Sequence, residues 1–128
     1  MKKKILIVDD DADFIVQLEL MLQQADFALD KAYSKAEAEE YLENNKPDLA
    51  IVDLMLENAD SGFALCYHIK KKYNNLPVIM VTAVTSETGF EFDTVTPEDK
   101  SWIKADVFLA KPIRFEQLKR EINRLLAK

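Results

Sequence analysis

Two kinds of segment alternate along this chain of 128 residues. Short apolar runs rich in Ile, Val and Leu predict strands that are covered on both faces. Four such runs stand out, at residues 5–8, 49–52, 78–81 and 107–109, and a weaker strand is expected at Ala28–Ala32. A longer segment with a different periodicity follows each run.

The longer segments carry apolar residues at helical spacing. The four clearest stripes are Phe14, Leu18, Met21 and Leu22; Ala38, Tyr41 and Leu42; Leu65 and Ile69; and Phe115, Leu118, Ile122 and Leu125. Ser34 and Glu37 predict a capping box at the start of the second helix, and Pro47 marks its end. Thr96 followed by Pro97 indicates the start of a further helix. Five alternations of strand and helix predict an α/β fold, in which helices wrap a parallel sheet.

Length and composition fit a single globular domain over residues 1–128. The formal net charge of −6 disfavours nonspecific binding to nucleic acid or anionic lipid, because such binding rests on many Lys and Arg contacts. Cys66 is the single cysteine, so no internal disulfide is possible, and its helical surroundings predict a small buried side chain. The first apolar run is too short for a signal peptide or a membrane span, so the expected location is the cytoplasm.

Polar residues follow the strong strands. Asp9 and Asp10 come after the first run, Asp53 after the second, Thr82 after the third and Lys111 shortly after the fourth. In an open parallel sheet the carboxyl ends of all strands face one edge, where ligands bind. Four segments that are distant in sequence are therefore expected to deliver these side chains to one crevice.

Three carboxylates in one crevice repel one another unless a cation joins them. Carboxylate-rich oxygen ligation suits Mg²⁺, which keeps several waters and leaves room for phosphate oxygens. On paper, Mg²⁺ and Lys111 balance the charges of the three aspartates. Such a site, with the Thr82 hydroxyl, suits phosphoryl transfer, which is mostly positioning and charge stabilisation. Asp53 stands alone at its strand end and is the candidate acceptor, which would form an acyl phosphate.

At these residues the sequence resembles the receiver domain of response regulators in two-component signalling, a family that includes the chemotaxis response regulator. The resemblance spans essentially the whole chain. The matching pieces are Val8-Asp9-Asp10-Asp11, Val52-Asp53-Leu54-Met55, Val81-Thr82-Ala83 and Ala105-Asp106-Val107-Phe108-Leu109-Ala110-Lys111-Pro112. One piece alone is a weak signal, whereas all of them in order and at suitable spacing are specific.

The resemblance implies a flavodoxin-like fold, with a five-stranded parallel sheet in the order 2-1-3-4-5 and five flanking helices. It implies that Asp53 takes a phosphoryl group from a sensor histidine kinase or a phosphotransfer protein. Asp10 and Asp53 would bind Mg²⁺ together with the backbone carbonyl of Met55. Asp9 would belong to the same metal site and act mainly through a water molecule.

Further roles are implied for residues of the last two strands. Thr82 and Lys111 would bind the phosphoryl oxygens, and the bond between Lys111 and Pro112 is expected to be cis. Thr82 and Phe108 would form a switch, in which the threonine moves toward the phosphoryl group and the ring turns inward. The altered face, made by the fourth helix, fifth strand and fifth helix, would contact an unknown downstream protein. Nucleic acid and membrane would have no direct part, and the chain would be a monomer or a phosphorylation-promoted dimer.

Two features depart from the family pattern. The 28 residues between Thr82 and Lys111 are several more than usual, and the surplus lies in residues 83–96. Lys104 stands where a glycine commonly precedes the alanine. Both departures fall on the usual output face and leave the expected phosphorylation site unchanged.

The positions two residues beyond Asp53 and Thr82 hold Met55 and Val84. In the family, these positions influence how water reaches the acyl phosphate. Two apolar side chains offer no group to orient a water molecule. We therefore expect a phosphorylated form that is fairly long-lived for the family.

Other functions remain open at this point. A receiver-like scaffold could bind its partner independently of phosphorylation, although degenerate relatives usually lose an acidic residue, the acceptor or the lysine. A Mg²⁺-dependent phosphatase with an aspartate nucleophile usually has a second acid two residues later, where this chain has Met55. A flavin-binding relative would need small hydroxylated residues where this chain has three negative charges.

Simpler interpretations are preferred for several polar or aromatic residues. Asp11 and Asp13 are expected to start a helix, where carboxylates interact well with the helix dipole. His68 lies among lysines and is expected on a solvent-facing helix surface. Trp102 is expected to anchor a short helix.

Overall fold

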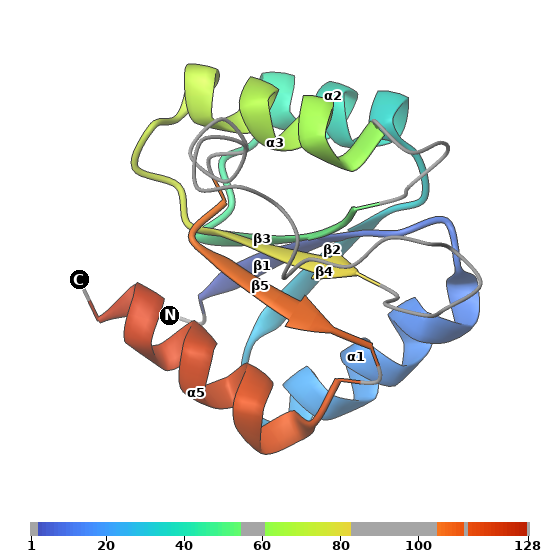
Figure 1. Cartoon of the computed structure of the whole chain (residues 1–128), viewed down its shortest axis with the longest axis vertical. Helices are drawn as coiled ribbons and strands as arrows, with labels where there is room; N and C mark the ends of the chain where they lie inside the picture. Colours follow the sequence, from blue (N-terminus) through green and yellow to red (C-terminus); the bar gives the residue numbers. More distant parts are fainter. Residues whose placement is uncertain (1–2, 55–60, 83–104, 112, 128) are drawn as a thin grey trace.

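The computed structural model describes residues 3–54, 61–82, 105–111 and 113–127. Its strands form one parallel sheet in the order β2-β1-β3-β4-β5, which confirms the predicted fold (Figure 1). The strands are β1 (Lys4–Val8), β2 (Ala28–Ala32), β3 (Leu49–Asp53), β4 (Val78–Thr82) and β5 (Val107–Ala110). Each lies within one residue of its predicted bounds. The apolar runs of β1, β3 and β4 are uninterrupted because these strands are buried, whereas the half-buried edge strand β2 carries Asp30 and Lys31.

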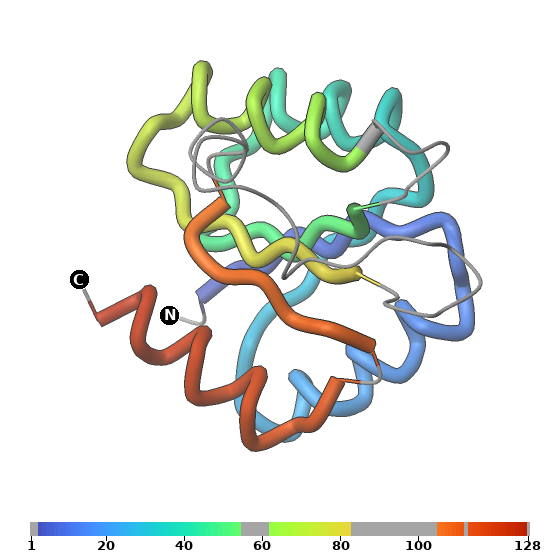
Figure 2. The backbone as a smooth tube through the Cα atoms, in the orientation of Figure 1, coloured from blue at the N-terminus to red at the C-terminus, as the bar shows by residue number. Residues whose placement is uncertain are grey.

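Four helices are described, and each carries one of the predicted stripes. They are α1 (Ala12–Gln24), α2 (Lys35–Asn44), α3 (Ser61–Lys72) and α5 (Phe115–Leu126). The helix expected near Thr96 and Pro97 falls outside the described residues. Figure 2 shows α2 and α3 on one face of the sheet and α1 and α5 on the other, as right-handed crossovers in a doubly wound sheet require. No helix in the described ranges is both long and apolar enough to span a bilayer.

The sheet divides the core into two layers. Side chains from alternate strand positions pack on opposite faces, because successive residues of a strand point in opposite directions. In β1, Leu6 and Val8 join the layer beneath α2 and α3, whereas Ile5 and Ile7 join the layer beneath α1 and α5. The same alternation carried past the strand ends decides which face each site residue reaches.

The helix starts largely follow the predicted signals. Asp11 caps α1, and its carboxylate accepts hydrogen bonds from the backbone N–H groups of Asp13 and Phe14 at 3.0 and 3.3 Å. The Ser34 hydroxyl accepts the N–H of Glu37 at 3.1 Å at the start of α2. The Glu37 carboxylate accepts the N–H of Tyr33 at 3.0 Å, one residue before the position expected for a capping box. Asp11 and Asp13 thus belong to a helix start, as predicted.

Candidate functional site

Three aspartates meet at the carboxyl edge of the sheet. Ile7 of β1 lies opposite Ile51 of β3, and both pack toward α1 and α5. Asp9 and Asp53 follow two residues later and reach the same face by strand alternation. Ligand oxygens of Asp9, Asp10 and Asp53 lie within 4.8 Å of one another. The structure therefore brings together the carboxylates that the sequence predicted to converge.

The three carboxylates differ in burial. The side chains of Asp9 and Asp53 are buried, at 1% and 8% exposed, whereas Asp10 is exposed. Burial raises the pKa of the Asp9 carboxyl above its ordinary value, and the nearby Asp10 charge adds to the rise. Hydrogen bonds from the Asp11 backbone N–H at 2.8 Å and the Lys111 ammonium at 3.1 Å offset part of it. An additional cation at this edge would favour the ionised form of Asp9.

Lys111 extends from the end of β5 to the buried carboxylate. Val107 and Leu109 of β5 pack toward α1 and α5, and Lys111 continues that parity. Its backbone N–H donates to the Thr82 carbonyl at 2.8 Å, which continues the pairing of β4 with β5. Its Nζ atom lies 3.1 Å from Asp9 Oδ2 and 4.1 Å from the centre of the Phe14 ring. The lysine is thus held at the crevice by the sheet and by two side chains.

Thr82 supplies a buried hydroxyl at the same edge. It ends β4, opposite Ala110 of β5, and is 2% exposed. Its Oγ1 atom has no hydrogen-bond partner among the residues that the structure describes. A buried hydroxyl without a partner costs free energy, so its presence at a ligand edge suits a bound acceptor atom.

Phe108 lies two residues before Ala110 on β5. It sits opposite Met80 of β4 and is half-buried against the core layer beneath α2 and α3. The ring and Thr82 therefore occupy neighbouring strands. The switch predicted for this pair stays a prediction.

Gly62 shapes the site, and the residue pattern alone did not identify it. Its backbone N–H donates to the Leu54 carbonyl at 3.1 Å, which holds the start of α3 against the end of β3. A Cβ atom at this position would lie 2.3 Å from the Asp53 carbonyl oxygen and 2.4 Å from that of Leu54. Only glycine permits this approach. The one signal in the sequence was a glycine three residues before the stripe of Leu65 and Ile69, in a chain with two glycines.

Phe14 is a second residue whose place at the site was missed. The sequence predicted it only as core, and it does pack in the layer beneath α1 and α5. Its ring also faces the Lys111 ammonium. Helical periodicity identifies the buried face of α1 but carries no information on a contact with the residue that follows β5.

The donor set fits a hard divalent cation. With all three carboxylates ionised, the cluster and the Lys111 ammonium would together carry two negative charges. All the converging ligand atoms are carboxylate oxygens, which Mg²⁺ prefers over softer donors. Asp9, Asp10 and Asp53 could hold such an ion, and the Thr82 hydroxyl and Lys111 ammonium could contact a phosphate group beside it. The expected ligand carbonyl of Met55 lies outside the described residues.

Several other predictions are settled by burial. Cys66 is fully buried in α3, and burial raises the pKa of its thiol to about 12, so it packs as a small apolar residue. His68 is exposed on α3, as predicted, and its Nδ1 atom lies 4.0 Å from Glu39 Oε2 of α2. Predictions about Val84, Trp102, Lys104, residues 83–96 and the cis bond at Pro112 fall outside the described residues.

Comparison with known proteins gives the same fold and identifies a family. The family model for the response regulator receiver domain matches residues 5–123. The chain is 36% identical over 114 residues to the regulatory protein VanR of Enterococcus faecium, covering 89% of this chain and 46% of that protein. It is 34% identical over 124 residues to the heme response regulator HssR of Staphylococcus haemolyticus, covering 96% and 51%. The chain thus spans about half the length of these curated relatives.

Solved structures extend the likeness to three dimensions. A putative response regulator from Chloroflexus aurantiacus superposes with a TM-score of 0.85 at 29% identity over 100% of both chains. A CheY-like receiver domain protein from Methanospirillum hungatei gives 0.83 at 25% identity, over 99% of this chain and 95% of that one. The family match over nearly the whole chain, on the fold described above, establishes that this chain belongs to the response regulator receiver domain family of two-component systems.

Proposed function

We propose that the chain is a phosphoacceptor domain that takes a phosphoryl group from a phosphohistidine onto Asp53. The donor would be a sensor histidine kinase or a phosphotransfer protein. The observation that carries this proposal is the convergence of three carboxylates within 4.8 Å, beside the Lys111 ammonium. A buried hydroxyl, that of Thr82, ends the neighbouring strand. This set supplies an acceptor and opposite charge for a phosphoryl group.

Asp53 would be the nucleophile of this transfer. One carboxylate oxygen of Asp53 attacks the phosphorus atom, and an O–P bond forms as the P–N bond to the donor histidine breaks. The electron pair of that bond leaves on the imidazole nitrogen, which takes up a proton. The product is an acyl phosphate. Lys111 would donate to one phosphoryl oxygen and Thr82 to another, so both groups act on the charge that the step moves.

Asp9, Asp10 and Asp53 would hold Mg²⁺, together with the backbone carbonyl of Met55. The bound ion would neutralise the crevice and the incoming phosphoryl oxygens. The contact between Asp9 and Lys111 supports this assignment. One ammonium can balance only one of the three carboxylates, which leaves negative charge in the crevice for the ion to balance. Asp10 is exposed and can reach an ion from the solvent side.

Phosphorylation would be transmitted by Thr82 and Phe108. A hydroxyl drawn toward the phosphoryl group vacates space beside β5, and the half-buried Phe108 ring would turn inward to fill it. The changed surface would include β5 and α5 and would control a downstream protein. The domain's own activity would be limited to its phosphorylation and dephosphorylation, and we place it in the cytoplasm, where its donor would act.

Incubation with acetyl phosphate and Mg²⁺, followed by intact-mass measurement, tests the proposal. The wild type should gain one phosphoryl group, and Asp53→Asn should gain none. Asp106→Asn is a matched control, because this carboxylate precedes β5 at the opposite edge of the sheet, and it should react as the wild type does. An undiminished adduct on Asp53→Asn, or none on the wild type, would contradict the proposal. Steady hydrolysis of a generic phosphomonoester would instead indicate a phosphatase.

A further inference from the structure

The Lys111 ammonium is enclosed by two groups of opposite character. Asp9 Oδ2 accepts a hydrogen bond from Nζ at 3.1 Å, and the centre of the Phe14 ring lies 4.1 Å from the same atom. The ring distance is well inside the range of roughly 6 Å over which a cation is attracted to an aromatic face. Lys111 is 21% exposed, so solvent only partly weakens the two contacts.

Phe14 is itself firmly placed. Its backbone N–H donates to the Asp11 cap at 3.3 Å in the first turn of α1. Its side chain is 8% exposed and packs in the core layer beneath α1 and α5. The ring therefore has little freedom to leave the lysine. Asp9 lies on the short connection between β1 and α1, five residues before Phe14, so neighbouring parts of the chain supply both contacts.

The ring and the carboxylate hold the ammonium in different ways. The ammonium has three N–H donors, and a carboxylate oxygen engages one of them. An aromatic face attracts the positive charge through its quadrupole and needs no acceptor lone pair. Donors consequently remain available for an incoming anion while Nζ stays at the edge of the crevice. A ring suits this task better than a second carboxylate, which would add repulsion to the aspartate cluster.

We propose that Phe14 is a positioning residue for Lys111, holding Nζ where it meets the phosphoryl group. This inference rests on the proposed function, because its consequence is a rate of acyl phosphate formation. In this role the ring acts through the lysine and makes no contact of its own with the phosphoryl group.

Three variants separate this role from core packing. Phe14→Leu keeps an apolar side chain but removes the aromatic face, whereas Phe14→Tyr keeps the face. Phe27→Leu is the matched control, because Phe27 packs against the same core layer and directly precedes β2, at the amino edge. The rate of adduct formation with acetyl phosphate and Mg²⁺ should fall roughly two- to thirtyfold in Phe14→Leu, the range that a cation–π contact spans. Phe14→Tyr should recover it, and Phe27→Leu should leave it unchanged.

A double-mutant cycle tests whether Phe14 acts through the lysine. In a Lys111→Met background the ammonium is absent, so adding Phe14→Leu should slow adduct formation no further. Equal slowing by Phe14→Leu with and without the ammonium would show a general effect on folding or packing. That outcome would overturn the positioning role.

Nuclear magnetic resonance detects the contact between the Phe14 ring and the Lys111 ammonium without any phosphorylation. A ring face near Nζ should shift the Lys111 ε-methylene protons upfield, and this shift should vanish in Phe14→Leu and persist in Phe14→Tyr. Absence of the shift in the wild type overturns the inference. If the wild type forms no adduct, the proposed function fails and the positioning role fails with it. If the wild type reacts and Phe14→Leu reacts equally fast, only the positioning role fails.

Discussion

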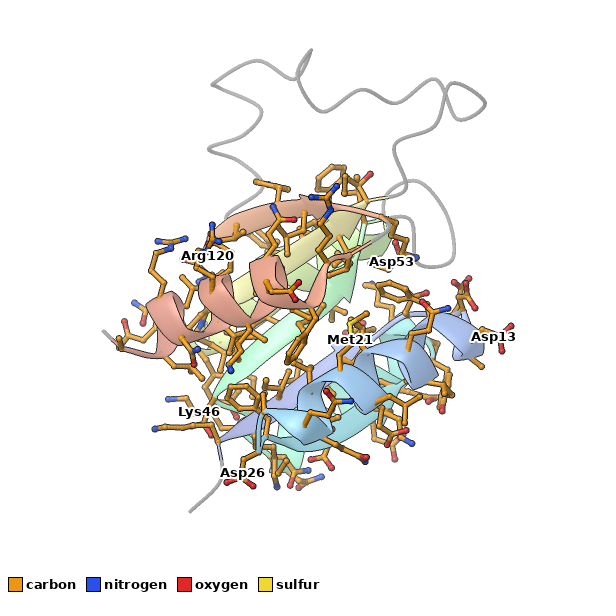
Figure 3. The ribbon with its side chains drawn as sticks, turned by 90° about the horizontal axis from the view of Figure 1, so that it is seen from below. Asp13, Met21, Asp26, Lys46, Asp53 and Arg120 are labelled. Atoms are coloured by element: carbon orange, nitrogen blue, oxygen red, sulfur yellow. The ribbon has the colours of Figure 1, made fainter. Side chains whose placement is uncertain are left out.

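Carboxylates at the two edges of the sheet have opposite surroundings: donors of the same chain at the amino edge, and other carboxylates at the carboxyl edge. At the amino edge, Asp106 accepts hydrogen bonds from the Lys70 ammonium at 2.7 Å and the Val78 N–H at 2.8 Å. Asp48 accepts the N–H of Lys4 at 2.7 Å. Figure 3 shows the carboxyl edge at the end of the sheet marked by Asp53 and Asp13, with Lys46 and Asp26 at the other end.

At the carboxyl edge negative charge gathers instead. Asp9, Asp10 and Asp53 share one small volume, burial raises the Asp9 pKa, and the Thr82 hydroxyl has no partner in the described ranges. Each of the two amino-edge carboxylates named above is matched by donors of the same chain, which fixes strand ends and loops. The carboxyl edge is left short of positive charge. The difference indicates that the donors at the amino edge stabilise the fold, whereas the groups at the carboxyl edge suit the binding of a cation.

Gly62→Ala should have the largest effect, because it disturbs the carboxyl edge through the backbone. The added Cβ would meet the carbonyl oxygens of Asp53 and Leu54, so α3 or the end of β3 must move. We expect a loss of about 3 kcal/mol in the free energy of unfolding, the cost of overpacking a rigid site. Denaturant titration measures it. Ala64→Ser, an exposed change on the same helix, should cost no more than about 0.5 kcal/mol; similar losses in both variants would contradict the close approach.

Mg²⁺ should stabilise the carboxyl edge. An ion that binds only the folded state at about 100 times its Kd adds about 2.7 kcal/mol to the free energy of unfolding. Thermal unfolding with Mg²⁺ and with a chelator measures this gain. Asp53→Asn removes one of the three converging carboxylates and should lose most of the gain. A gain of the same size in that variant would exclude Asp53 as a ligand.

Asp106→Ala should destabilise the amino edge of the sheet and leave the carboxyl edge unchanged. The change leaves the Lys70 ammonium and the Val78 N–H without this acceptor, and a lost acceptor of this kind costs about 2 kcal/mol. Chemical denaturation should show the loss, while the response to Mg²⁺ should stay as in the wild type. A reduced Mg²⁺ response would mean that the two edges are coupled.

The smallest expected effect is the pH dependence of Asp9→Asn in metal-free buffer. Because the Asp9 pKa is raised in the folded state, the folded protein keeps a proton that the unfolded chain releases. The wild type should therefore lose stability as the pH rises from the ordinary carboxyl pKa through the raised one, and Asp9→Asn should lack this loss. Unfolding curves measured between about pH 4 and pH 7 compare the two proteins. This range runs from roughly the ordinary aspartate pKa of 3.9 to neutrality. A variant that is relatively less stable at the higher pH would reverse the sign.

The sequence was sufficient to predict the strands of the sheet and the convergence of most of the candidate site residues. Buried parallel strands are short apolar runs, so the polar residue after each run marks the carboxyl edge. The positions of Asp9, Asp53 and Lys111 after their runs were enough to predict that the three side chains meet. The prediction works because a parallel sheet leaves little choice about where strand ends lie.

The contacts missed by the sequence join residues whose local pattern has a different explanation. Phe14 fits a helical stripe, and Asp106 and Lys70 are ordinary polar residues of a loop and a helix. Periodicity reports which face of an element is buried, whereas a pair such as Lys111 and Phe14 depends on how two elements meet. Gly62 is similar, because the need for glycine arises from the approach of α3 to β3.

The position of the phosphoryl group tests the central claim most directly. Borohydride reduces an aspartyl phosphate to homoserine, which peptide mass spectrometry can assign to a residue. After treatment with acetyl phosphate and Mg²⁺, we predict homoserine at position 53 and unchanged aspartates at 9, 10 and 106. Homoserine at position 9 or 10, or at no position in a protein that remains folded, would contradict the account.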